Sequence, residues 1–80
     1  MKTFKDLEES LRRNRRTDFS SREAHALAFE MLNGLYGSPA LFDWVNGAPS
    51  SGVRSLLGIP ESGLRAEAWQ LLKEAKNTML

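Results

Sequence analysis

The stretch EAHALAFEMLNGLY, residues 23–36, decides the fold because its apolar residues recur with the period of an α-helix. One face of that helix holds Ala24, Leu27, Ala28, Met31, Leu32 and Leu35. A continuous apolar face of this kind is normally buried against other elements of a globular protein. The stretch therefore predicts a core helix. The preceding Ser20-Ser21-Arg22-Glu23 has the pattern of a capping box and predicts that the helix begins there.

Other segments carry the same kind of signal. Helices are predicted over about 3–16, 39–46, 52–57 and from 61 or 62 to 77, with Gly-Ser-Pro and Gly-Ile-Pro junctions between some of them. No stretch alternates apolar and polar residues with period two, as a half-buried strand would. The sequence predicts an all-α fold, a compact bundle of four to five short helices without a sheet, forming a single domain over residues 1–80. We expect the second and last helices to be its scaffold and the short third helix to fill its middle.

The composition argues against several classes of function. The chain has 80 residues, a net charge of +1, no cysteine and one histidine, His25, which we expect to be solvent-exposed. Without cysteine there is neither a disulfide nor a thiolate zinc site, and no apolar run is long enough for a membrane span. No catalytic, metal-binding or phosphate-loop motif is present. We therefore expect a cytoplasmic, non-enzymatic protein with no cofactor and no bound metal.

The basic residues concentrate in one short segment, which contains Arg12, Arg13, Arg15 and Arg16. Glu8 and Glu9 precede the first two by one helical turn and can pair with them. The last two have no acid one turn upstream, so they are candidates for contact with an acidic protein surface or a phosphate backbone. A solvated helix end that complements the helix dipole explains the cluster equally well.

The segment VRSLLGIPESGLRAEAW, residues 53–69, offers an alternative. Leu57, Gly58, Ile59 and Leu64 stand where the helix-turn-helix motif places its turn and its flanking apolar residues, so the segment resembles that motif. The resemblance implies a nucleic-acid-binding regulator that reads DNA with residues 53–69 and clamps phosphates with the arginines of 12–16. Arg54 departs from the motif, because a small residue is usual there, and Glu61 would face phosphates.

Aromatic residues exceed what a small core obviously needs. Phe29 and Tyr36 lie seven residues apart and off the main apolar face, and the third helix, which carries Trp44, has little polar surface. Surplus apolar surface of this kind is typical of interfaces with a partner or with a second copy of the chain.

These observations favour a small protein-binding module, an adaptor or an inhibitor of a larger bacterial or phage-targeted complex. The expected contact residues are Arg12, Arg13, Arg15, Arg16, Phe29, Tyr36 and Trp44. The expected partner is a protein with an acidic surface, with nucleic acid and self-association into a homodimer as alternatives.

Overall fold

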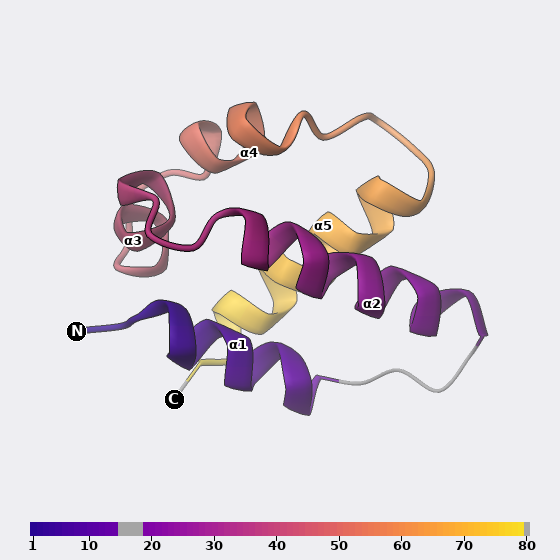
Figure 1. Ribbon diagram of the computed structural model, residues 1–80, viewed down its shortest axis with the longest axis horizontal. Coiled ribbons are helices and arrows are strands. Elements are labelled where there is room, and N and C mark those ends of the chain that lie inside the picture. The colour runs from indigo at the N-terminus through magenta and orange to yellow at the C-terminus, as the bar shows by residue number, and fades with distance from the viewer. Residues whose placement is uncertain (15–18, 80) are drawn as a thin grey trace.

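The computed structural model describes residues 1–14 and 19–79, with the side chains of 1–14 and 22–79. It contains five helices: α1 (Phe4–Arg13), α2 (Phe19–Gly34), α3 (Pro39–Val45), α4 (Ser51–Leu57) and α5 (Leu64–Asn77). No strand occurs in these described ranges, and the predicted all-α bundle is confirmed (Figure 1).

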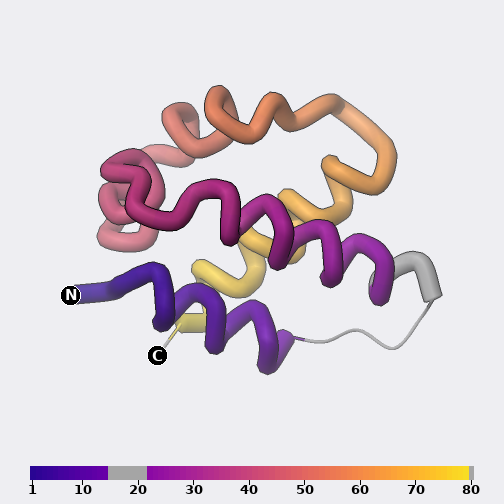
Figure 2. Tube along the Cα trace, in the orientation of Figure 1, coloured from indigo at the N-terminus to yellow at the C-terminus, as the bar shows by residue number. Residues whose placement is uncertain are grey.

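Helices α2 and α5 cross at the centre and form the scaffold, as the sequence predicted. Helix α1 packs against both of them and lies on one side of α2, whereas α4 lies on the other side (Figures 1 and 2). Helix α3 packs on α1 and α4 at one end of the bundle. The expectation that α3 fills the middle is therefore wrong, because α2 and α5 meet directly there.

The core consists of the apolar faces of all five helices. Its members include Leu7 and Leu11 of α1, Leu32 of α2, Val53 of α4 and Leu72 of α5, each with no exposed surface. Five of the six residues of the predicted α2 face are buried, and the sixth, Leu27, is only half-buried. The helical period therefore identified the correct inner face of α2.

Three helix ends differ from the prediction. Helix α1 ends at Arg13 because the backbone of Asn14 leaves the helical region, at φ −88° and ψ 58°. Helix α5 begins at Leu64 because Gly63 has φ +94°, a left-handed conformation that glycine adopts easily but that an α-helix excludes. Helix α2 begins at Phe19, so Ser20 is inside the helix and is not its N-cap.

A buried polar cluster joins the C-terminal ends of α1 and α5. The Ser10 hydroxyl has no exposed surface and donates to the carbonyl oxygen of Ala75 at 2.5 Å. The Asn14 amide donates to the Ser10 carbonyl oxygen at 2.7 Å and to the Thr78 hydroxyl at 2.8 Å. Since every buried side-chain N or O atom in the described part of the chain is hydrogen-bonded, the cluster carries no desolvation penalty for an unpaired group.

His25 joins α2 to α1 and is not the solvent-exposed residue that we expected. Its side chain is half-buried, and Nε2 lies 2.6 Å from the carbonyl oxygen of Leu11. A carbonyl oxygen only accepts, so Nε2 carries a hydrogen and donates it. The ring also meets Phe29 edge-on, with centroids 5.0 Å apart. These contacts give the histidine a structural role at the α1–α2 contact.

The N-terminal segment is held by Asn46, which follows α3. The Asn46 side chain accepts from the backbone N–H of Lys2 and donates to the carbonyl oxygen of Lys2, both at 2.8 Å. Its amide also donates to the Phe42 carbonyl oxygen at 2.9 Å. This pairing fixes the segment that enters α1 and thereby places Phe4 beside the turn between α2 and α3.

Candidate functional site

Three aromatic side chains, Phe4, Tyr36 and Phe42, form what we call the aromatic patch. Phe4 and Tyr36 meet edge-to-face, with ring centroids 5.0 Å apart and planes at 85°. Tyr36 is 75% exposed and Phe42 is 42% exposed, although both carry large apolar rings. Isolated exposed apolar residues are normal on a protein surface, but a cluster of aromatic rings points to an interaction site.

The patch borders an apolar hollow of about 400 Å³. The hollow is lined by Phe4, Tyr36, Gly37, Ser38, Pro39, Leu41, Phe42 and Asp43. Gly37 has φ +80°, a conformation that reverses the chain after α2 and returns α3 alongside Tyr36. Pro39 then fits the first position of α3, where its missing N–H would have no helical partner in any case.

The chemistry of this hollow suits an apolar guest. Its floor is hydrocarbon and aromatic, and the charged group in its lining is the exposed carboxylate of Asp43. The other polar side chains of the lining are Ser38 and Tyr36, and Tyr36 carries its hydroxyl on an otherwise apolar ring. Such a hollow can receive an aliphatic or aromatic side chain of another molecule.

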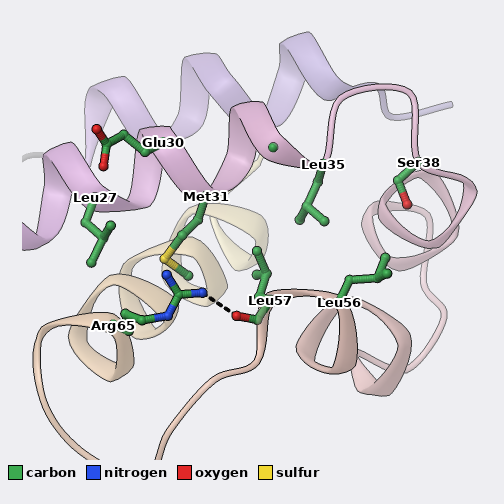
Figure 3. A pocket seen from close by; sticks show the side chains of 9 residues that line it. Leu27, Glu30, Met31, Leu35, Ser38, Leu56, Leu57 and Arg65 are labelled. Carbon is green, nitrogen blue, oxygen red and sulfur yellow. Dashed lines mark hydrogen bonds between the residues drawn. The ribbon is translucent and has the colours of Figure 1, made fainter.

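A second hollow, which we call the α2–α4 groove, lies between α2, α4 and the start of α5 (Figure 3). Its volume is about 480 Å³, and it is lined by Leu27, Glu30, Met31, Gly34, Leu35, Ser38, Leu56, Leu57 and Arg65. Ser38 lines both hollows, so the two surfaces are neighbours at the C-terminal end of α2.

The groove has charged groups on opposite sides. Glu30 stands on the α2 side and Arg65 on the α5 side, and Met31 points from α2 toward Arg65 (Figure 3). The Arg65 guanidinium donates to the Leu57 carbonyl oxygen, one of the last carbonyls of α4. This hydrogen bond ties the start of α5 to the end of α4 and holds Arg65 at the edge of the groove.

The structure separates the predicted arginines from the aromatic patch. Arg12 and Arg13 are exposed in the last turn of α1, whereas Phe4 begins that helix. Nine residues of helix place Arg13 about 13 Å along the axis from Phe4. Arg15 and Arg16 lie outside the described residues. Arg12 and Arg13 thus lie at the opposite end of α1 from Phe4.

Of the three aromatic residues expected at the contact surface, only Tyr36 is well exposed. Trp44 is 4% exposed and stacks on Trp69 with centroids 5.1 Å apart, so its assignment to the contact surface is corrected to the core. Phe29 is half-buried against the core and meets His25. Phe29 and Tyr36 share no helix face, because α2 ends at Gly34.

The helix-turn-helix resemblance does not extend to the geometry of α4 and α5. Six residues, 58–63, separate the two helices, whereas the motif uses a turn of about three or four. Helix α4 packs on α3, and α5 packs on α2 and α1. The would-be reading helix buries Ala68, Trp69, Leu71, Leu72 and Ala75, and is the central helix of the core.

Sequence reasoning missed several members of the two surfaces. Neither Phe4 nor Leu56 was among the expected contact residues, yet Phe4 meets Tyr36 and Leu56 is 62% exposed. Phe42 gave one usable signal, because four large apolar residues in a seven-residue helix cannot all face inward. No local pattern could have joined Glu30 to Arg65, which are distant in the chain.

Comparison with known proteins found no matching family model, no similar curated protein and no similar solved structure. Among the described residues, no helix combines the length and the apolar character that crossing a membrane requires. The same residues contain no group of three or more His, Cys, Asp or Glu side chains arranged to hold a metal ion.

Proposed function

We propose that this chain is a small cytoplasmic, non-enzymatic protein-binding module, an adaptor or an inhibitor of a larger bacterial or phage-targeted complex, and that it contacts its partner through the aromatic patch. The observation that supports this proposal is the exposure of Tyr36 and Phe42 beside an apolar hollow. The cytoplasmic location rests on the absence of cysteine, which suits a reducing compartment.

The patch has the properties of an interaction hot spot. Aromatic side chains carry a large apolar area on few rotatable bonds, so ordering them on binding costs little entropy. Phe4 already holds the Tyr36 ring edge-on, and Asn46 holds the segment that leads to Phe4. This preorganisation lowers the free-energy cost of association further.

The exposed Arg12 and Arg13 support a polar contribution from an acidic partner. They lie about 13 Å from the patch along α1, so one partner must have a broad surface to reach both. A stable interface of ordinary size covers roughly 800 Å² on each partner, which is wide enough for this separation. Removal of these charges is expected to slow association and to reduce its sensitivity to salt, whereas removal of the aromatic rings should weaken the complex more.

Nucleic-acid binding receives less support, because the helix that would read DNA carries acidic residues. The outer side of α5 carries the exposed Glu67 and Glu74, which would repel phosphates, and α5 itself belongs to the core. We therefore treat nucleic-acid binding as an outcome that the experiment must separate from protein binding.

The test compares three immobilised baits: the wild type, Tyr36→Ala with Phe42→Ala, and Leu56→Ala. Leu56 is the matched control, because it is also an exposed apolar residue but lies in the other hollow. Lysate of the source cells is applied with and without nuclease, and the affinity of the captured protein is then measured with purified components.

We expect the double variant to lose at least tenfold in affinity, equivalent to about 1.4 kcal/mol, while Leu56→Ala retains wild-type affinity. Melting curves should show that all three baits are folded. Equal binding by the wild type and the double variant would refute the patch as the contact surface. Capture that disappears with nuclease, and an affinity for duplex DNA that falls steeply with salt, would instead favour the regulator.

A further inference from the structure

We propose that the α2–α4 groove binds a second copy of this chain, so that two copies form a two-fold symmetric homodimer. This inference goes beyond the proposed function, because it uses a different surface. It would turn a module with one aromatic patch into a dimer with two.

The first reason is that the groove contains both a projection and a hollow. Leu56 is 62% exposed at the edge of a hollow of about 480 Å³, whose apolar lining includes Leu27 and Leu35. In a two-fold interface the same surface of each copy meets the other, so a projecting residue can enter the hollow of its counterpart twice.

The second reason is charge. Glu30 and Arg65 stand on opposite sides of the groove, one acid and one base (Figure 3). When two copies meet face to face with the two-fold axis running along the groove, the α2 side of one copy lies over the α5 side of the other. Glu30 of each copy then faces Arg65 of the other, which gives two identical ion pairs. A groove that carries both signs in this arrangement is complementary to itself.

The third reason is the absence of a side chain at Gly34, which also lines the groove. A Cβ atom built at Gly34 would meet nothing within 4 Å, so the space beside its backbone is open. Another chain can therefore approach α2 closely at this point. The same fact offers a variant, Gly34→Gln, whose side chain begins in this open space and should obstruct the approach.

The size of the groove sets the expected strength. A standard interface covers roughly 800 Å² per partner, about a sixth of the 4974 Å² surface of this chain. The groove is lined by nine residues, fewer than the roughly 20–30 that one side of a standard interface contributes, so we expect a weak dimer with a dissociation constant on the order of 10 μM.

Sedimentation equilibrium of the full chain tests the proposal over protein concentrations from about 1 μM to about 1 mM. The wild type should approach twice its 9.0 kDa mass at the upper end. Glu30→Arg should weaken the dimer at least tenfold, because it places two arginines opposite each other. Combining it with Arg65→Glu reverses both charges and should restore dissociation to within about threefold of the wild type.

Two controls keep the result interpretable. Glu67→Arg reverses an exposed acid of α5 that does not line the groove, and it should leave the dimer unchanged. Arg65→Glu removes the hydrogen bond to Leu57, so circular dichroism must show that the doubly changed chain is folded. If the doubly changed chain is unfolded, Gly34→Gln is measured in its place, and it should weaken the dimer as Glu30→Arg does.

A wild type that stays monomeric at about 1 mM overturns the proposal, as does a dimer that neither Glu30→Arg nor Gly34→Gln weakens. The result is separate from that of the partner experiment. Tyr36→Ala with Phe42→Ala should weaken partner binding and leave the dimer intact, whereas Glu30→Arg should weaken the dimer and leave partner binding intact.

Discussion

The same substitution at two leucines of α2 should have very different costs. Leu32 has no exposed surface and lies in the central cluster, whereas Leu27 is half-buried and lines the α2–α4 groove. Replacing Leu32 with alanine removes buried methyl groups and leaves an enclosed cavity, at a cost of about 3–5 kcal/mol. Replacing Leu27 only widens a hollow that is already open, so its cost is about 1–2 kcal/mol.

These magnitudes are large for a chain of this size. Stabilities of roughly 0.05–0.15 kcal/mol per residue give about 4–12 kcal/mol for 80 residues. Leu32→Ala should therefore remove a quarter or more of the free energy of unfolding and can unfold the protein outright. Leu27→Ala should leave it folded, with a midpoint of urea unfolding that is only modestly lower.

Urea unfolding followed by tryptophan fluorescence measures both values, because Trp44 and Trp69 are buried and stacked on each other. The protein concentration should be about 1 μM, so that self-association adds nothing to the apparent stability. Equal costs at the two positions, or a greater cost at Leu27, would show that the groove is not open in solution. That result would also weaken the argument for the dimer.

Two further predictions concern polar groups. Ser10→Ala should lower the free energy of unfolding by about 1 kcal/mol and the melting temperature by about 4–8 °C. The loss is small because the Ala75 carbonyl and the Asn14 amide keep other hydrogen-bond partners. A loss above about 3 kcal/mol would contradict this reasoning. Hydrogen bonds from the backbone N–H and then the hydroxyl of Thr3 hold the pKa of Asp6 below its ordinary value of 3.8. The Asp6 carboxylate therefore stabilises the fold above pH 3.8, and this contribution is lost as pH falls through the lower, folded-state pKa. Melting curves of the wild type and Asp6→Asn between about pH 5 and pH 2 should show a difference in stability that closes at the acidic end.

Helical period alone was sufficient for the class of fold and for most of the core. The face of residues 24–35 is an inner face, since apolar residues three and four apart lie on one side of any helix. Glycine and proline also marked the ends of several helices, because their backbone restrictions are local. Gly63 was not recognised as such an end, so the start of the last helix was placed two or three residues too early.

The placement of the sites required the tertiary structure. Trp44, Phe29 and Tyr36 looked alike in the sequence, but one is stacked in the core, one is half-buried and one is exposed, because exposure depends on which helix packs above each ring. The bond between Ser10 and Ala75 and the groove that joins Glu30 to Arg65 connect distant parts of the chain. A local pattern determines which side of a helix turns inward, but only the packing of helices determines which of those sides remain uncovered.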